Sequence, residues 1–332
     1  AYKSLFHVDS SDVYMPLTPM FHVHAWGVPF LFTMLGAKQV YPGRFTPENT
    51  LRLAIKENVT FSHCVPTIIH MLLNCPLIKT MQFSNWKFVI GGSALPLGLL
   101  KDAQKHGLEL HAAYGLSETA PLLTIANLKP HMFDWSPDQQ EAVRCLTGMP
   151  VANVDLEIVG FDGKPLPHDG KSVGEVVARS PWLTQGYYHD KEKSEELWSG
   201  GWLHTGDIGT IDSDGYLKIT DRLKDVIKTG GEWISSLDLE DILSRHSAVS
   251  EAAVIGVPDE KWGERPLALV VLKETDNQNI VADHLKQFCL RYVAKGVIPK
   301  YGVPEQILFV DAIPKTSVGK INKKEIRIRY IK

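Results

Sequence analysis

The sequence predicts an α/β protein in which a parallel sheet with crossover helices precedes a small β-barrel subdomain and a compact α+β domain at the C-terminus. Apolar strand-like runs alternate with helical patterns through the first third of the chain. From about residue 150 the strands become short and alternating, with turn signals such as Asp162-Gly163 and Asp214-Gly215 between them. After Asp221 helices and longer apolar strands return. We therefore expect a large domain over residues 1–223, with its barrel at about 150–220, and a small domain over 224–332.

The first third divides into strands bounded by turn residues and helices with one apolar face. The segment Pro47–Glu57, for example, carries Leu51, Ala54 and Ile55 at helical spacing. The expected strands are Val13–Leu17, Lys38–Tyr41, Phe61–Val65, Lys87–Ile90 and Glu109–Ala113. The expected helices are Trp26–Leu35, Pro47–Glu57, Thr67–Leu73 and Pro96–His106.

The remaining elements follow from period-two alternation and from helix-start signals. Ser236 is a good N-cap with Glu240 behind it, so a helix is expected from Leu237 to Ser244. Strands are expected at Val154–Val159, Gly174–Arg179, Gly209–Asp212, Tyr216–Thr220, Glu251–Val257, Leu267–Leu272 and Gln306–Val310. Further helices are expected at Ile280–Ala294 and in the basic segment that ends the chain.

Composition excludes several classes of protein. The 332 residues carry 35 Lys+Arg and 38 Asp+Glu, and 44% are hydrophobic, which argues against disorder and against a nucleic-acid partner. The longest apolar stretch, Ala25–Ala37, is interrupted by Pro29 and is too short for a membrane span. The four cysteines show no C-x-x-C spacing, which argues against a zinc site or disulfide framework and favours a cytoplasmic location.

Two glycine-containing segments follow predicted strands of the parallel sheet. Gly91, Gly92, Ser93 and Ala94 come where open α/β sheets bind ligands, although a plain strand-to-helix turn would look the same. The segment Tyr114–Thr119 should end at the same edge. Its aromatic ring can stack on a base, its hydroxyls can bind phosphate and its Glu can hold Mg²⁺. The alternative is a helix N-terminus capped by Ser117.

Three later segments could also contribute to chemistry. Asp207 follows Gly206, and a carboxylate in a tight turn suits a ribose diol, although it could merely close the turn. The charged stretch Asp221–Gly231 lies where the pattern changes and is a candidate interdomain linker. Lys320 stands on a loop of small residues that could bring its charge to a phosphate, or could simply be a basic surface loop.

Taken together and in this order, these segments resemble the AMP-forming acyl-CoA synthetases of the adenylate-forming superfamily. The resemblance extends from Met15 to Lys323. Within the family, HVHAWG and GGEWISS are most similar to the medium- to long-chain fatty-acyl branch. The matching stretches are MPLTPMFHVHAWG, GGSALP, YGLSETAP, GWLHTGDIG, DRLKDVIKTGGEWIS and PKTSVGKINK.

The resemblance implies a first step in which a fatty acid and ATP form an acyl-adenylate. Lys320 would bridge the carboxylate and the α-phosphate, and Glu118 would hold Mg²⁺. Ser117, where the family usually has Thr, would bind the AMP phosphate. The remaining nucleotide and acyl contacts would come from Gly91, Gly92, Ser93, Ala94, Tyr114, Gly115, Asp207 and Arg222, of which the last two would hold the ribose.

The resemblance also implies a second step, transfer of the acyl group to coenzyme A. The small domain would rotate about the hinge residue Lys224, which would exchange Lys320 for the face around Lys228. Gly230 and Gly231 would let pantetheine pass close to the backbone, with Trp233 beside its channel. His22 would lie near the acyl carbonyl and the thiol. Trp26 would stand at the mouth of the acyl channel or, equally, be an ordinary core residue.

One family feature has no counterpart in this sequence. A phosphate-binding loop of the type TSGTTG-x-P-K is absent, and the chain opens at Ala1 without Met, so we expect an N-terminally truncated synthetase. A separately encoded N-terminal segment could complete it. The resemblance also suggests a homodimer, since relatives of this branch are often dimers. The alternative hypothesis is a non-catalytic chain, or one that performs only the second half-reaction.

Overall fold

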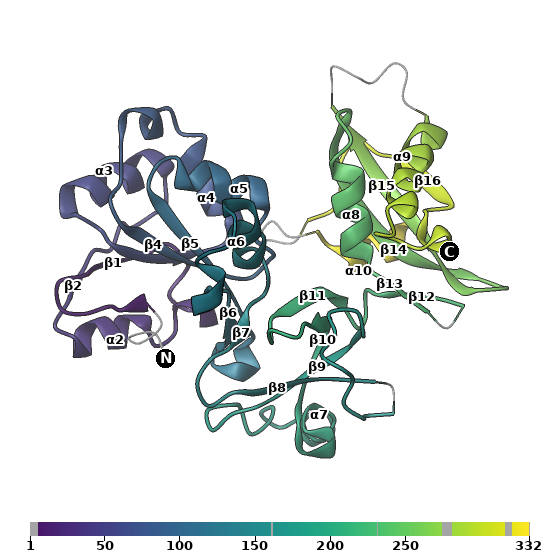
Figure 1. The fold of residues 1–332 in the computed structure, drawn as a ribbon, viewed down its shortest axis with the longest axis horizontal. Helices are drawn as coiled ribbons and strands as arrows, with labels where there is room; N and C mark the ends of the chain where they lie inside the picture. The colour runs from purple at the N-terminus through teal and green to yellow at the C-terminus, as the bar shows by residue number, and fades with distance from the viewer. Residues whose placement is uncertain (1–5, 161, 231, 274–280, 316–320, 332) are drawn as a thin grey trace. The chain divides into compact units, whose positions relative to one another are not determined.

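The computed structural model describes residues 6–160, 162–230, 232–273, 281–315 and 321–331. The chain forms two compact units. The first comprises residues 1–205 and 209–219, and the second comprises residues 206–208 and 220–332 (Figure 1). No helix among the described residues has the length and apolar character needed to cross a bilayer. Each unit has its own hydrophobic core.

The first unit is built on a seven-stranded sheet with the order β2-β1-β3-β4-β5-β6-β7. The strands β2, β1, β3, β4 and β5 pair in parallel, as expected, whereas β6 and β7 add an antiparallel edge. The carboxyl ends of β1, β3, β4 and β5 therefore meet at one edge of the sheet. The bounds are β1 Val13–Pro16, β2 Lys38–Gln39, β3 Phe61–Cys64, β4 Trp86–Ile90, β5 Leu108–Gly115, β6 Leu122–Ile125 and β7 Met149–Pro150.

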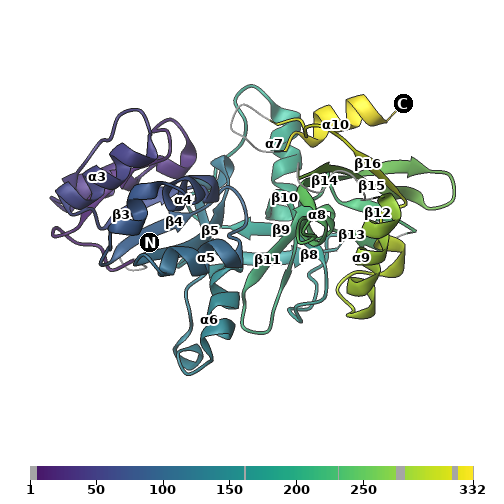
Figure 2. The same ribbon diagram turned by 90° about the horizontal axis from the view of Figure 1, so that it is seen from above.

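Helices cover both faces of this sheet. Alternate strand residues point to opposite faces, so Tyr14 packs with Phe32 of α2 while Met15 packs with the helices on the other side. Figures 1 and 2 show α3, α4 and α5 together over that second face. The bounds are α2 Val28–Met34, α3 Pro47–Glu57, α4 Pro66–Leu73, α5 Leu97–Gln104 and α6 Pro137–Arg144.

The chain then forms a second, four-stranded sheet with the strand order β11-β10-β9-β8, in which β11 and β8 are the edge strands. The strand β10 begins well before the expected Gly209, so Asp207 lies within a strand and the prediction of a tight turn there is wrong. Polar residues and a glycine follow one another over 204–207 without alternating with apolar residues, so the sequence shows no strand pattern there. The bounds are β8 Asp155–Val159, β9 Gly174–Arg179, α7 Lys191–Leu197, β10 Leu203–Ile211 and β11 Leu217–Arg222.

The second unit is the expected α+β fold. Its sheet has the order β13-β12-β15-β14, with β16 parallel to β15. Apolar residues of α8 and α9 pack on one face of this sheet and Ile326 of α10 packs on the other. The bounds are β12 Ile227–Thr229, β13 Glu232–Ile234, α8 Ser236–Ser244, β14 Val249–Asp259, β15 Gly263–Leu272, α9 Ala282–Ala294, β16 Gln306–Phe309 and α10 Lys323–Tyr330.

The start of α8 differs from the sequence prediction by one residue. Ser235, and not Ser236, is the N-cap, because its hydroxyl accepts a hydrogen bond from Asp238 N at 3.0 Å. The Ser236 side chain is buried and is used in a different interaction, described below. Two adjacent serines satisfy the same capping pattern, so the sequence alone could not separate them.

Candidate functional site

The two glycine-containing segments lie side by side at the carboxyl edge of the main sheet. The strands β4 and β5 are parallel neighbours, with Ile90 opposite Ala112. Gly91 continues from β4 and donates a backbone hydrogen bond to Cys64 O of β3 at 3.2 Å. The segments Gly91–Ala94 and Tyr114–Glu118 therefore leave neighbouring strands at the same edge, as the sequence predicted. Within Gly91–Ala94, only Gly91 is buried.

The turn after β5 is too tight for any residue but glycine at position 115. A Cβ at Gly115 would overlap the backbone carbonyl of Pro121, which folds back over it. Thr119 closes this turn, since its hydroxyl accepts from Leu116 N at 2.8 Å and donates to Pro121 O at 2.5 Å. The short 3-10 helix Ser117–Thr119 follows Leu116, so Ser117 is its first residue and not its cap. Ser117 is exposed.

Glu118 has a partner that the sequence did not suggest. The Tyr187 hydroxyl donates to Glu118 Oε1 at 2.8 Å. Partial burial, followed by the hydrogen bond to Glu118, raises the pKa of Tyr187 to about 12, so the hydroxyl stays protonated near neutral pH. Tyr187 is far from Glu118 in sequence, and the only local signal was an aromatic pair after Gly186.

The donor set at Glu118 fits Mg²⁺. No group of three or more metal-ligating side chains gathers anywhere in the described part of the chain. Magnesium is commonly bound by one or two carboxylates together with substrate phosphates, so a single carboxylate beside a nucleotide is a suitable protein ligand. Glu118 Oε1 is taken by Tyr187, whereas Oε2 accepts no hydrogen bond from the described residues.

His22 and Trp26 follow the carboxyl end of β1, at the same sheet edge. His22 is exposed in a turn in which its backbone N donates to Pro19 O at 2.9 Å. Trp26 is 47% exposed and its indole Nε1 donates to Phe21 O at 3.1 Å, so it is not an ordinary core tryptophan. Phe30 and Met34 of α2 are also exposed, at 75% and 85%. This region therefore offers apolar side chains on the molecular surface.

In the second unit, the structure pairs Asp207 with Arg222. Asp207 is only 4% exposed, and Arg222 Nε lies 3.3 Å from its Oδ1. Leu223 N donates to Gly206 O at 2.9 Å, which holds the two segments together next to this pair. A buried carboxylate oriented by a guanidinium is a fixed acceptor for hydroxyl groups. The structure thus brings together the two residues for which a ribose-binding role was predicted.

The hairpin β12–β13 carries the other predicted residues of this unit. Lys228 lies opposite Trp233 in the register of the two strands, and Lys228 is exposed. Gly230 has φ +60° and donates to Trp262 O at 2.8 Å. A Cβ at Gly230 would lie 3.1 Å from the Trp262 indole, so this glycine lets the ring approach the backbone. Trp262 was not singled out from the sequence. Gly231 lies outside the described residues, as does Lys320 of the earlier prediction.

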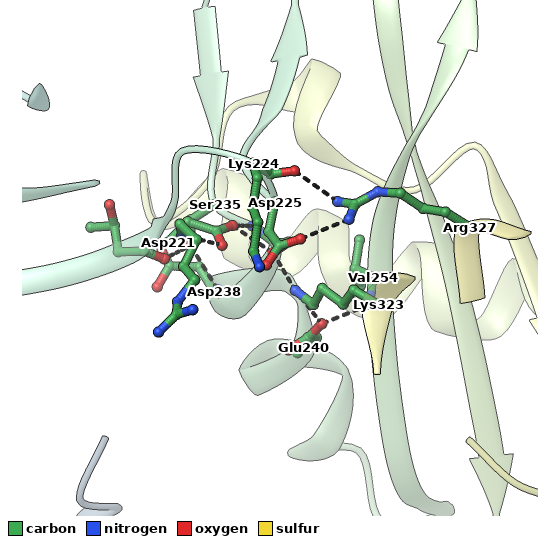
Figure 3. Close-up of polar contacts among 12 residues, drawn as sticks. Asp221, Lys224, Asp225, Ser235, Asp238, Glu240, Val254, Lys323 and Arg327 are labelled. Carbon is green, nitrogen blue, oxygen red and sulfur yellow. Dashed lines mark hydrogen bonds and ion pairs between the residues drawn. The ribbon is translucent and has the colours of Figure 1, made fainter. Parts of the chain in front are cut away.

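The predicted linker is tied to the last helix by a buried polar network, shown in Figure 3. Asp221 Oδ2 accepts from Ser236 N at 2.7 Å and from Ser236 Oγ at 2.5 Å. Ser236 Oγ accepts in turn from Lys323 Nζ at 2.5 Å, and the same ammonium lies 2.8 Å from Glu240 Oε1. Burial raises the pKa of Glu240, although the charge of Lys323 opposes this.

A second contact from α10 reaches the proposed hinge residue. Arg327 donates to Lys224 O at 3.1 Å and to Asp225 Oδ1 at 2.8 Å (Figure 3). The guanidinium therefore fixes the peptide group that joins these two residues. Through Lys323 and Arg327, helix α10 therefore restrains the segment 221–225 near the first and the last residue of that segment.

Comparison with known proteins agrees with this arrangement. The family model of the AMP-binding enzymes matches residues 1–188, and the model of the AMP-binding enzyme C-terminal domain matches residues 238–320. A long-chain-fatty-acid–CoA ligase of Thermus thermophilus is 40% identical, over 97% of this chain and 59% of its own length. A 3-methylmercaptopropionyl-CoA ligase of Ruegeria lacuscaerulensis is 41% identical, over 96% of this chain and 58% of its own length.

The solved structure of o-succinylbenzoate CoA synthetase from Bacillus subtilis, in complex with an acyl-adenylate intermediate, superposes with a TM-score of 0.82. The two sequences are 26% identical, and the match covers 98% of this chain and 62% of the synthetase. The chain thus spans less than two thirds of the length of these relatives. With two family models matched in order and the glycine segments on adjacent parallel strands, the chain belongs to the family of AMP-binding enzymes that includes the acyl-CoA ligases.

Proposed function

We propose that this protein activates a fatty acid with ATP, through an acyl-adenylate, and transfers the acyl group to coenzyme A. The observation that carries the proposal is the position of Gly91–Ala94 and Tyr114–Glu118 on neighbouring parallel strands at one sheet edge. Such an edge is where open α/β sheets bind nucleotides. The matched acyl-CoA ligases support the same reaction class.

In the adenylation step, a carboxylate attacks the α-phosphate of ATP and pyrophosphate leaves. Both reactants are anions, so the site must supply positive charge and fixed positions. Mg²⁺ bound at Glu118 would neutralise phosphate charge, and Lys320 would bridge the two reacting groups. Tyr114 would stack on adenine, with Gly91–Ala94 beside it. Ser117 would donate to the phosphate.

In the thioester-forming step, the coenzyme A thiol attacks the acyl carbonyl and AMP leaves. We propose that the exposed face of the hairpin β12–β13 lines the pantetheine path, with Lys228, Trp233 and the Trp262 indole along it. The close contact of Trp262 with Gly230 supports this, because it leaves a flat apolar ring beside exposed backbone. Lys224 would be the residue about which the second unit turns between the two steps.

For the acyl group we propose a medium or long fatty chain, with His22 near its carboxyl group and Trp26 at the mouth of its channel. The exposed side chains of Trp26, Phe30 and Met34 support an apolar ligand in this region. One relative of similar identity is named a 3-methylmercaptopropionyl-CoA ligase, and its name contains a short thioether acyl group. An assay in which decanoate and 3-methylmercaptopropionate compete for activation therefore measures which acyl chain length the protein prefers.

The proposed function is tested by supplying ATP, Mg²⁺ and decanoate to the chain and measuring pyrophosphate. Release of pyrophosphate, followed by decanoyl-CoA formation when coenzyme A is added, is the expected result. A parallel assay supplies decanoyl-adenylate with coenzyme A. Product in the second assay alone would restrict the chain to the second half-reaction. No product in either assay would contradict the proposal.

Exchange of Asp207 for Asn should weaken AMP binding by about 10- to 100-fold, because a buried charged acceptor for the ribose hydroxyls is replaced by a neutral one. The side chain keeps its size, so the fold should be retained. Isothermal titration calorimetry with AMP measures the effect. The control Asp214→Asn removes a carboxylate from a surface turn. Equal AMP affinity of Asp207→Asn and wild type would exclude Asp207 from the ribose site.

Exchange of Lys228 for Ala should slow decanoyl-CoA formation from supplied decanoyl-adenylate by about tenfold or more, with pyrophosphate release unchanged. The expectation follows from the place proposed for the exposed Lys228 along the pantetheine path. Single-turnover rates of the two steps provide the measurement, with the exposed Lys273→Ala as control. A defect confined to pyrophosphate release would overturn the assignment of Lys228 to the second step.

A further inference from the structure

Glu118 is held from a distant part of the first unit by two separate hydrogen bonds. Tyr187 donates its hydroxyl to Glu118 Oε1 at 2.8 Å. Thr184 donates its backbone N to Glu118 O at 2.9 Å. The segment Thr184–Tyr187 thus fixes both the main chain and the carboxylate of the same residue.

The segment Thr184–Tyr187 is itself anchored to α7 and to the residue that follows this helix. Trp198 donates its indole Nε1 to Thr184 O at 2.9 Å. Ser194 of α7 accepts a hydrogen bond from Tyr187 N at 2.8 Å, and donates its hydroxyl to Asp190 O at 2.6 Å. The backbone on both sides of Gln185-Gly186 is therefore fixed, and this fixes the position from which the Tyr187 side chain extends.

Gly186 permits the close approach of this segment to α7. A Cβ at position 186 would lie 2.7 Å from Ser194 Oγ and 2.9 Å from Ser194 Cβ, closer than side chains tolerate. Any larger residue would push Ser194 away and remove the acceptor for Tyr187 N. The glycine, the serine and the tyrosine therefore act together to place one hydroxyl on one carboxylate oxygen.

We propose that Tyr187 is a positioning residue that orients the Glu118 carboxylate so that Oε2 faces the Mg²⁺ of the bound nucleotide. The inference rests on the metal-binding role of Glu118 in the proposed function. A carboxylate can bind a cation through one oxygen or both, and a hydrogen bond to Oε1 favours binding through Oε2 alone. Magnesium requires near-ideal octahedral geometry, so it gains from a ligand whose orientation is fixed in advance.

The test uses Mn²⁺ as a spectroscopic substitute for Mg²⁺. Mn²⁺ is titrated into ATP with and without the whole chain, and free Mn²⁺ is measured by electron paramagnetic resonance, so that binding added by the protein is separated from binding to ATP alone. Tyr187→Phe keeps the ring and removes only the hydroxyl, and it should weaken Mn²⁺ binding about tenfold. Tyr188→Phe is the matched control, because this adjacent tyrosine is 91% exposed, and it should bind Mn²⁺ like the wild type.

Two further measurements separate the possible outcomes. Affinity for AMP without metal should be the same in Tyr187→Phe and wild type, and a tenfold loss there would show a merely structural role and overturn the inference. Glu118→Gln should abolish the Mn²⁺ binding that the protein adds to that of ATP alone. If Glu118→Gln weakens binding but Tyr187→Phe does not, the inference alone is wrong. If Glu118→Gln binds Mn²⁺ like the wild type, the metal role of Glu118 fails and the inference fails with it.

Discussion

Replacement of Lys320 by Ala is expected to slow acyl-adenylate formation by about 10²- to 10³-fold, the usual effect of removing one preorganised electrostatic group. Lys320 lies outside the described residues, so this expectation comes from the PKTSVGK motif. The attack of a carboxylate on a phosphate brings two negative charges together, and the ammonium group would offset their repulsion where it is greatest. Acyl transfer from supplied adenylate to coenzyme A develops less charge at that position and should be nearly unaffected.

The measurement compares pyrophosphate release from ATP and decanoate with thioester formation from decanoyl-adenylate. The control Lys324→Ala removes an exposed lysine from the same part of the chain without touching the motif. An equal loss in both steps would contradict a role that is confined to adenylation. So would an unchanged rate of pyrophosphate release.

Replacement of Lys323 by Ala, only three residues further on, is expected to lower the free energy of unfolding of the second unit by about 3–5 kcal/mol. Lys323 is only 9% exposed, and its ammonium group contacts both Ser236 Oγ and Glu240 Oε1. Without it, the buried Glu240 carboxylate would lose its ion-pair partner while the buried Asp221 carboxylate stays close by. Removing one partner of a buried charged network costs far more than removing an exposed lysine.

Urea unfolding followed by circular dichroism measures this effect for the whole chain. Because two compact units can unfold separately, hydrogen exchange of the peptides that cover α8 and α10 assigns the loss to the second unit. The control is again Lys324→Ala, which should change stability by less than about 0.5 kcal/mol. The double variant Lys323→Met, Glu240→Leu should recover part of the loss, because it removes both charges of one pair. A Lys323→Ala variant as stable as the control would contradict the buried network.

The sequence predicted the first unit well because its elements are short, strongly apolar and separated by clear turn residues. The helix Pro47–Glu57 has the predicted bounds, since Thr46 accepts from Asn49 N at its start and Asn58 ends it in a left-handed conformation. The shared edge of β4 and β5 was also predictable, because strands joined by a crossover helix pair in parallel. The polar helices α6 and α7 were missed, as their sequences carry few apolar residues.

The partners of the candidate site could not be predicted, because they depend on contacts between distant parts of the chain. Nothing near Tyr187 in the sequence indicates that its hydroxyl reaches Glu118. The last helix reads simply as basic, yet Lys323 is buried while Lys324 is exposed. Ser235 and Ser236 are chemically identical, and only the fold decides that the first caps α8 and the second binds Asp221.

The network around α10 bears on the proposed rotation about Lys224. This helix begins three residues after Lys320 in the sequence. Its Lys323 donates to Ser236, which in turn donates to Asp221, and its Arg327 donates to the carbonyl of Lys224. Rotation about Lys224 that leaves Asp221 behind has to break the bonds between Asp221 and Ser236. The free energy of these hydrogen bonds therefore adds to the barrier for the proposed rotation.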